Sequence, residues 1–380
     1  MAPTRFIALD ALRGFILALM ILVNTPGSWS AVYSPLLHAK WHGFTFADLV
    51  FPGFLFVVGA AMFFALKNQQ WDTASVQKVL RRTLLMFVLG LGLNFLWTPD
   101  LSQMRLMGVL QRIALCYGMA ALLVLALKPF FTGAQQQYGI PLLSTLLLGF
   151  YWCVLQLGSE PYSLSGNIAG VIDRAVLGEH RLYQGFGMPF DPEGLLSTLG
   201  AVVNVLLGYW VAAELSQRQP KAGMWWLLAV GALMLVLSQL AASFWPVNKA
   251  LWTGSYVLQS TGLLLWLLAL MVWLVDIRCY RAICEPLRVY GSNPLFIYIL
   301  SWCWTVLLSK VLVWQVVGAG SEAGTGSIGS TEMSAYQWLY QLLQSGFADK
   351  PASLLFALLH VGFFWLISYV LYRRQIFIKI

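Results

Sequence analysis

Ten stretches of about 20 mostly apolar residues follow one another along this chain, and they restrict its fold more than any other feature. A stretch of that length crosses a bilayer as a helix, because backbone groups in lipid must bond within their own segment. The sequence therefore predicts an all-α polytopic membrane protein, a bundle of 10–11 transmembrane helices in one domain over residues 1–380. The expected spans are 6–26, 44–66, 80–97, 106–127, 139–158, 194–214, 223–244, 253–275, 289–313 and 351–372.

The composition agrees with this class and excludes others. Only 10% of the residues are charged and 59% are hydrophobic, whereas soluble domains carry about 25% charged residues. The net charge of +8 does not indicate a nucleic-acid partner, because the basic residues lie in short loops where they orient helices. The five cysteines are scattered, so we expect no metal site.

The basic residues are distributed unequally between the two ends of the predicted helices. Fourteen of them fall at the termini and in the even-numbered gaps between spans, and seven fall on the opposite side. The positive-inside rule then places both termini in the cytoplasm. Two long outer loops are expected near residues 159–193 and 314–350, and the second contains a Gly/Ser-rich tract that is flexible by composition.

The run L-L-H-A-K-W-H-G-F-T-F-A-D-L-V-F-P, residues 36–52, is the strongest candidate for a site. It places His38 and Asp48 at a membrane boundary, where polar groups cost free energy unless they are used or satisfied. An imidazole can accept a proton near neutral pH or be acylated itself. Asp48 can fix the tautomer of His38, and Asn24, at the end of the first span, can hold a carbonyl or oxyanion. We interpret His42 as a bystander.

Further polar residues lie within the spans. Arg112 is an intramembrane arginine that could meet a phosphate or pair with a carboxylate of the first two spans. Asn293 either begins the ninth helix as its N-cap or binds a ligand. Three residues are assigned to substrate binding or to structure: Asp10 and Arg13, which share one helix face, and Trp41.

The order of several motifs resembles the heparan-α-glucosaminide N-acetyltransferase family, most closely its bacterial NagX-type members. The motifs are D-A-L-R-G-F, L-V-N-T-P-G, H-A-K-W-H-G-F-T-F-A-D-L-V-F-P, G-V-L-Q-R-I-A, F-D-P-E-G-L-L-S-T, P-V-N-K-A-L-W-T-G-S-Y-V-L and G-S-N-P-L-F-I-Y. The resemblance covers nearly the whole chain, and its histidine-containing run is the most specific part.

The resemblance implies a homodimeric enzyme of the bacterial inner membrane that moves an acetyl group from cytosolic acetyl-CoA to the amine of a glucosamine. Within this resemblance we expect no counterpart of the large N-terminal luminal domain of the lysosomal members, and the expected acceptor is therefore free glucosamine or a small amino sugar. A sugar transporter or proton-coupled transporter is the competing interpretation. The absence of an internal repeat and the clustering of polar residues at one end argue against it.

The resemblance also assigns roles to individual residues. The essential histidine is His38, supported by Asn24 and Asp48. His38 either deprotonates the sugar ammonium or accepts the acetyl group first, and the sequence leaves both routes open. The phosphates of CoA are expected on the cytoplasmic side, at Arg81, Arg82, Arg112, Arg288, Asn293 and Lys379.

Overall fold

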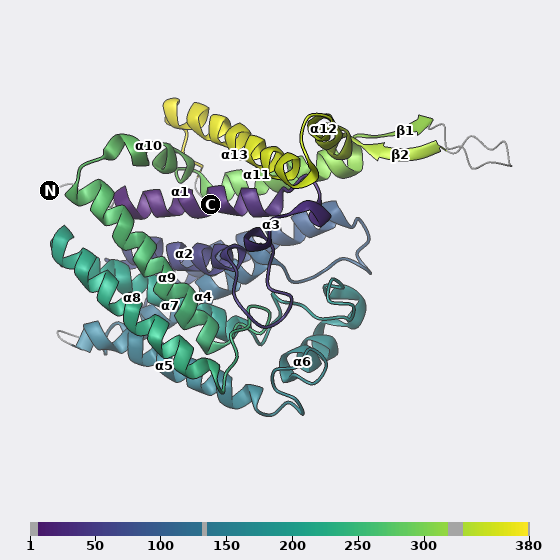
Figure 1. The fold of residues 1–380 in the computed structure, drawn as a ribbon. Coiled ribbons are helices and arrows are strands. Elements are labelled where there is room, and N and C mark those ends of the chain that lie inside the picture. The colour runs from purple at the N-terminus through teal and green to yellow at the C-terminus, as the bar shows by residue number, and fades with distance from the viewer. Residues whose placement is uncertain (1–6, 131–134, 318–329, 379–380) are drawn as a thin grey trace.

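The computed structural model describes residues 7–130, 135–317 and 330–378, shown in Figure 1. Within this part of the chain, ten helices are long and apolar enough to cross a membrane by length and composition. They confirm the predicted polytopic all-α fold with ten spans. The α-helices of these spans are α1 (Ile7–Asn24), α2 (Val50–Leu66), α3 (Thr73–Trp97), α4 (Val109–Leu127), α5 (Gln135–Leu155), α7 (Thr198–Leu215), α8 (Pro220–Ala242), α9 (Gly254–Val272), α11 (Pro294–Val306) and α13 (Asp349–Arg373). The span of α11 continues as a helical turn to Val311.

Three shorter helices and one hairpin connect these spans. The predicted outer loop 159–193 contains α6 (Ile168–Leu177), which begins where the Asn167 side chain accepts a hydrogen bond from the Gly170 amide at 2.7 Å. The predicted outer loop 314–350 contains α12 (Ala335–Gln344) and most of an antiparallel hairpin of β1 (Val313–Val317) and β2 (Ser330–Ser334). Most of its Gly/Ser-rich tract lies outside the described residues.

The expected ninth span, 289–313, is divided near its start. Helix α10 (Arg281–Tyr290) ends beside Gly291, and α11 begins at Pro294. The break lies against α1, because a Cβ on Gly291 would lie 2.6 Å from the Asp10 carbonyl oxygen. Glycine is therefore needed at this close approach.

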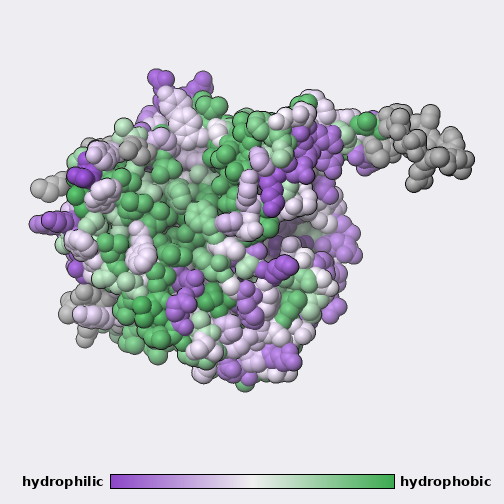
Figure 2. Space-filling model, in the orientation of Figure 1, coloured by the Kyte–Doolittle hydropathy of each residue, from purple (hydrophilic) through white to green (hydrophobic). Residues whose placement is uncertain are grey.

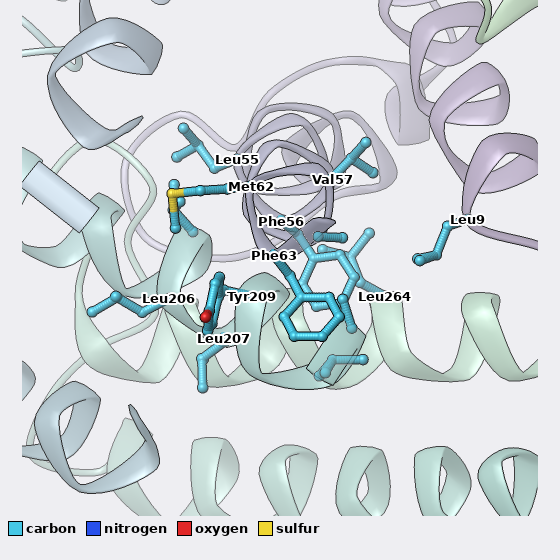
Figure 3. Packing of buried hydrophobic residues seen from close by; sticks show 14 of the residues in the cluster. Leu9, Leu55, Phe56, Val57, Met62, Phe63, Leu206, Leu207, Tyr209 and Leu264 are labelled. Atoms are coloured by element: carbon cyan, nitrogen blue, oxygen red, sulfur yellow. The ribbon is translucent and has the colours of Figure 1, made fainter. Parts of the chain in front are cut away.

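Helix α2 packs against α7 in the centre of the bundle. Figure 3 shows apolar side chains of α2, among them Phe56 and Phe63, beside Leu206 and Tyr209 of α7. The two backbones approach closely at a pair of glycines. A Cβ on Gly59 would lie 1.9 Å from a carbonyl oxygen of α7, and one on Gly208 would lie 2.0 Å from the Phe56 carbonyl oxygen. Small residues at a membrane helix interface permit this contact, which fixes the position of α2.

The surface is apolar where a bilayer would contact it. Large exposed hydrophobic side chains lie on the outward faces of α3, α5, α8 and α13, for example Leu84, Leu146, Leu240 and Leu366. Figure 2 shows apolar residues over the middle of one face and hydrophilic residues gathered toward both ends of the helices. This distribution is that of a protein embedded in lipid.

Candidate active site

The start of α2 holds a buried carboxylate. Residues Phe46–Leu49 form a 3-10 turn before the helix, and Asp48 is the third residue after its N-cap, Thr45. The Asp48 Oδ2 atom accepts hydrogen bonds from the Thr45 amide at 3.0 Å, the Thr45 hydroxyl at 3.0 Å and the Ala39 amide at 3.2 Å. The Tyr256 hydroxyl donates to the Asp48 carbonyl at 2.7 Å and ties the turn to α9. The carboxylate is thus held by short local bonds, with Oδ1 left for other partners.

His38 is the first of those partners. Its Nδ1 lies 2.8 Å from Asp48 Oδ1. A carboxylate only accepts, so Nδ1 carries the hydrogen and Nε2 keeps its lone pair. The His38 side chain is 43% exposed, whereas that of Asp48 is fully buried. A reactant can therefore reach the imidazole while the carboxylate orients it from behind. The structure brings together the histidine and aspartate that the sequence suggested as partners.

Lys249 is the second partner. Its Nζ lies 3.4 Å from Asp48 Oδ1, 2.9 Å from His38 Nδ1 and 3.2 Å from His38 Nε2. Its side chain is only 18% exposed. Burial lowers the pKa of the Lys249 ammonium below its ordinary value, although the negative charges of Asp48 and Glu193 act in the opposite direction. A primary amine therefore stands directly against the imidazole.

The loop between α8 and α9 fixes the backbone around Lys249. The Asn248 side chain accepts from the Leu251 amide at 2.8 Å, and the Asn248 amide donates to the Thr253 hydroxyl at 3.0 Å. The loop also contacts the histidine run. The Gly43 amide donates to the Val247 carbonyl at 2.9 Å, and the Asn248 side-chain amide lies 3.3 Å from Nδ1 of His42. Lys249 was not predicted as a site residue, because a lysine in a loop between two spans also fits the role of a basic residue that orients helices. The sequence signal that could have revealed Lys249 is the run P-V-N-K-A-L-W-T-G, which contains it and is one of the family-like motifs.

The two other candidates from this end of the molecule differ in their surroundings. Asn24 is exposed at the end of α1, and its side chain makes no hydrogen bond within the described residues. Trp41 donates its Nε1 hydrogen to the Tyr162 carbonyl at 2.8 Å. Its ring packs edge-on against Phe186 and Phe190, with centroids 5.6 and 5.3 Å away. Trp41 thereby joins the histidine run to the 159–193 segment.

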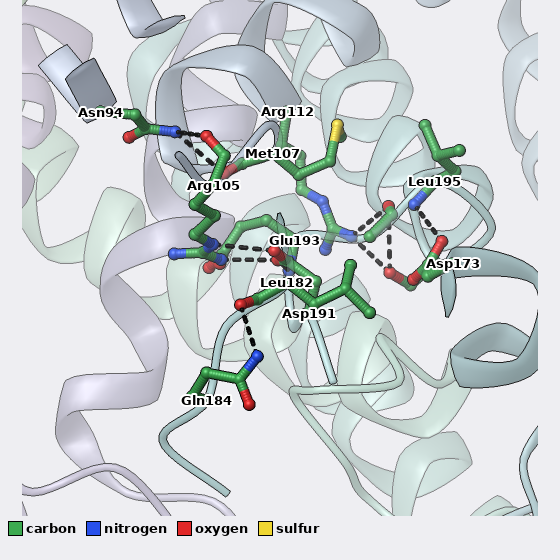
Figure 4. A network of polar contacts seen from close by, with 12 residues as sticks. Asn94, Arg105, Met107, Arg112, Asp173, Leu182, Gln184, Asp191, Glu193 and Leu195 are labelled. Atoms are coloured by element: carbon green, nitrogen blue, oxygen red, sulfur yellow. Dashed lines mark hydrogen bonds and ion pairs between the residues drawn. The ribbon is translucent and has the colours of Figure 1, made fainter. Parts of the chain in front are cut away.

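A network of buried charges anchors that segment to the bundle (Figure 4). Arg105 donates to both oxygens of Asp191, at 2.8 and 2.5 Å, and also to Glu193. Burial alone would lower the pKa of Arg105, but the two carboxylates raise it above its ordinary value. Nearby, Asp173 accepts from the Leu195 amide at 2.9 Å. Burial, with a smaller contribution from the charge of Asp191, raises the pKa of Asp173 to about 6.

Arg112 lies deep in the protein beside this network. Its side chain is fully buried and donates to the Gly194 carbonyl at 2.8 Å and to the Ser197 hydroxyl. Its guanidinium carbon lies 5.1 Å from the centre of the Trp252 ring. A phosphate contact for Arg112 stays a prediction, and the partners in the structure are groups of the protein.

A cavity of about 560 Å³ lies toward the other end of the bundle. It is lined by α1, α2, α3, α4, α11 and the segment after α13, and its wall on α2 is apolar. Two guanidinium groups border it. Arg82 lies with its charge 4.9 Å from the centre of the Tyr117 ring, and Arg13 pairs with Asp10 at 3.2 Å. The structure thus confirms that Asp10 and Arg13 share a helix face, and it adds Arg13 to the cavity lining.

The other residues predicted to bind the cofactor do not line this cavity in the part of the chain that the structure describes. Arg81 is exposed and does not line the cavity. Arg288 donates to Glu285 at 2.8 Å and to the Tyr372 hydroxyl. The Asn293 side chain makes no N-cap bond; it donates to the Ile376 carbonyl at 2.9 Å and accepts from the Ile378 amide at 2.7 Å. Lys379 lies outside the described residues. Across the described ranges no group of three or more His, Cys, Asp or Glu residues could hold a metal ion.

Comparison with known proteins gives consistent matches. The family model for the catalytic region of heparan-alpha-glucosaminide N-acetyltransferase matches residues 5–150. The human heparan-alpha-glucosaminide N-acetyltransferase is 26% identical over 434 residues, covering all of this chain and 60% of the relative. The mouse enzyme of the same name is 27% identical over 358 residues, covering 78% of this chain and 53% of the relative. The chain therefore spans little more than half the length of these relatives.

Proposed function

Because the chain belongs to the heparan-α-glucosaminide N-acetyltransferase family, we propose that it transfers the acetyl group of acetyl-CoA to the amine of glucosamine or a related small amino sugar. The observation that carries this proposal is the His38–Asp48 pair, which lies within the matched region. Assembly as a homodimer and residence in a bacterial inner membrane belong to the proposal through the resemblance alone.

The geometry of the pair suits the acyl transfer. As the sugar nitrogen attacks the thioester carbonyl, Nε2 of His38 takes its proton and Asp48 stabilises the resulting imidazolium. The carbon–sulfur bond breaks, and the proton passes to the sulfur of CoA. The exposed amide of Asn24, at the end of α1, offers a hydrogen bond to the carbonyl oxygen as negative charge develops there. The same lone pair on Nε2 also permits a route through an acetylated His38.

The cavity suits the donor. On α2 its lining runs from Met62 to Phe54, which is about 12 Å of helix, and Phe54 lies only six residues after Asp48. An apolar wall fits the narrow pantetheine arm. The guanidinium groups of Arg13 and Arg82 fit the phosphates, because paired charge-assisted hydrogen bonds match phosphate oxygens. Helix α2 thus connects the proposed donor cavity to the base.

The test is acetyl transfer in detergent. The purified chain is incubated with labelled acetyl-CoA and glucosamine, and we expect N-acetylglucosamine and free CoA to form. His38→Ala should abolish product while acetyl-CoA binding persists. The matched control is His180→Ala, which removes an exposed histidine of the 159–193 segment and should leave turnover unchanged. Absence of product from the wild type, or normal turnover of His38→Ala, would contradict the proposal. A transporter would form no acetylated sugar in this assay.

We also propose that both termini face the cytoplasm, as the basic residues indicate. Gln184 and Gln217 are exposed at opposite ends of the bundle. In a variant without native cysteines, Gln184→Cys should react with an impermeant thiol reagent added outside intact cells, and Gln217→Cys should react only after lysis. The opposite pattern would invert the orientation.

A further inference from the structure

Lys249 supplies the chemical group that the proposed reaction consumes. An acetyl acceptor in this site is a primary amine whose proton a neighbouring base can remove. Lys249 Nζ lies against the imidazole ring of His38, 2.9 Å from Nδ1 and 3.2 Å from Nε2, and Nε2 keeps its lone pair when Nδ1 donates to Asp48. Asp48 Oδ1 lies 3.4 Å from the same amine. An amino sugar bound for transfer needs the same imidazole beside its nitrogen.

Among the lysines that the structure describes, Lys249 alone contacts an imidazole. The Lys128 amine donates to three backbone carbonyls, those of Leu66, Lys67 and Gln69, at 2.7 to 3.1 Å, and none of these is a base. Lys40 is exposed on the histidine run only two residues after His38. The rate of acetylation of Lys40 therefore gives the reactivity of a nearby lysine that is not held against the imidazole.

The position of the Lys249 amine is imposed by its surroundings. Its loop is held by the bonds of Asn248 to Leu251 and Thr253, and the side chain is mostly buried. Burial also lowers the pKa of its ammonium, which increases the share of neutral, nucleophilic amine. Holding two reacting groups in contact replaces an encounter in solution with a reaction within one molecule.

We propose that Lys249 is an internal acetyl acceptor, which this site acetylates when acetyl-CoA is bound and no amino sugar is present. This inference rests on the proposed function. The Lys249 nitrogen attacks the thioester carbonyl, a nitrogen–carbon bond forms and the carbon–sulfur bond breaks. His38 takes the proton from the nitrogen and the sulfur of CoA receives it. The products are an amide at Lys249 and free CoA thiol.

The modification would close the site. Acetyl-lysine is neutral, so its ion pair with Asp48 is lost, and its acetyl group occupies space beside His38 that the acceptor needs. An amino sugar whose ammonium displaces Lys249 from His38 would prevent the reaction. The enzyme would therefore lose activity when it holds donor without acceptor, and the acceptor would protect it.

The experiment uses the full wild-type chain in detergent with acetyl-CoA as the only substrate. Peptide mass spectrometry follows acetylation of Lys249 against that of Lys40. We expect Lys249 to be acetylated at least about tenfold faster than Lys40, as a base held in contact implies. Addition of glucosamine should suppress the reaction. His38→Ala should reduce acetylation of Lys249 to the rate of Lys40.

Activity provides a second measurement. Preincubation with acetyl-CoA alone should progressively reduce the later turnover of glucosamine in the wild type. Lys249→Arg keeps the positive charge but replaces the amine by a guanidinium, which is not a comparable acetyl acceptor. The turnover of this variant, whatever its initial level, should therefore not fall during preincubation with acetyl-CoA. If the wild type acetylates glucosamine while Lys249 reacts no faster than Lys40, or equally fast in His38→Ala, the inference is wrong and the proposed function stands. If no amine is acetylated, both fail.

Discussion

Replacement of Asp48 by Asn tests how the carboxylate controls His38. Asp48 Oδ2 takes three donors, the two amides of Ala39 and Thr45 and the Thr45 hydroxyl, while Oδ1 faces His38 and Lys249. An asparagine has one oxygen for these two positions. The oxygen should occupy the Oδ2 position, because that orientation keeps three hydrogen bonds.

The amide nitrogen of the variant then points at His38. Its hydrogens meet Nδ1–H, so the imidazole must change tautomer and place its hydrogen on Nε2. The lone pair needed to accept a proton from the acceptor is then lost. A hydrogen bond to a charged group contributes about 1.5–3 kcal/mol, so loss of the Asp48–His38 bond alone should reduce turnover about ten- to a hundredfold. The tautomer change should add to this loss.

The assay is the turnover of glucosamine at saturating acetyl-CoA, with acetyl-CoA affinity and Tm measured in parallel. We expect Asp48→Asn to lose turnover while binding acetyl-CoA nearly as well as the wild type. Asp349→Asn makes the same chemical change at an exposed residue at the start of α13 and should change neither the turnover nor the acetyl-CoA affinity. Near-normal turnover of Asp48→Asn in a folded protein would refute the role given to this carboxylate.

Three further predictions concern the cavity, the helix packing and a buried acid. Arg82→Gln should weaken the binding of acetyl-CoA about tenfold or more and leave the binding of a short acetyl thioester unchanged. Arg81→Gln, at a residue that does not line the cavity, should change the affinity for neither compound; calorimetry measures both affinities. Gly208→Ala should lower the free energy of unfolding by about 1–3 kcal/mol, because the new Cβ would collide with the backbone of α2. Gly92→Ala should not cause this loss, because a Cβ there points into open space; the Tm values of the two variants test the difference. Raising the pH from about 4 to about 7 should destabilise the wild type relative to Asp173→Asn, as followed by Tm.

The direction of the pH effect follows from the pKa of Asp173. The folded protein holds this proton up to about pH 6, whereas the unfolded chain releases it near the ordinary value of 3.8. The folded state therefore binds more protons between these values, and stability falls as the pH rises through them and is level above. The contribution is at most about 3 kcal/mol. Equal pH dependence of the Tm in Asp173→Asn and wild type would contradict this account. Equal acetyl-CoA affinity of the Arg82→Gln and Arg81→Gln variants would contradict the prediction for the cavity. Equal Tm of the two glycine variants would contradict the prediction for the helix packing.

The parts of the structure that follow from local sequence were predictable. Ten spans follow from apolar length, because a helix is the only open segment that satisfies its backbone in lipid. The His38–Asp48 contact was also accessible, since only ten residues separate them and a turn before α2 brings them together. The start of a helix beside Asn293 was also among the expectations, and α11 begins at the next residue, Pro294.

The contacts that join distant segments were not predictable in the same way. Lys249 meets His38 only because the loop between α8 and α9 packs on the histidine run, and a lone lysine between two spans also has the pattern of a topology signal. Asn293 precedes a proline and looks like an N-cap, but its amide bonds the segment after α13, which folds back from the end of the chain. Glu193 belongs to the expected outer loop 159–193 but is buried, because the charge of Arg105 neutralises its carboxylate.

Helix α2 explains how the proposed donor and base can act together although the cavity and the histidine lie at different depths. Asp48 precedes the first turn of α2, where the helix dipole favours a carboxylate, and the cavity wall begins at Phe54 of the same helix. The close contact of Gly59 and Gly208 with the facing backbones prevents α2 from moving independently of α7. The distance between a thioester in the cavity and the base beside Asp48 is therefore set by one rigid element. A reaction that depends on alignment at the scale of a hydrogen bond benefits from such a link.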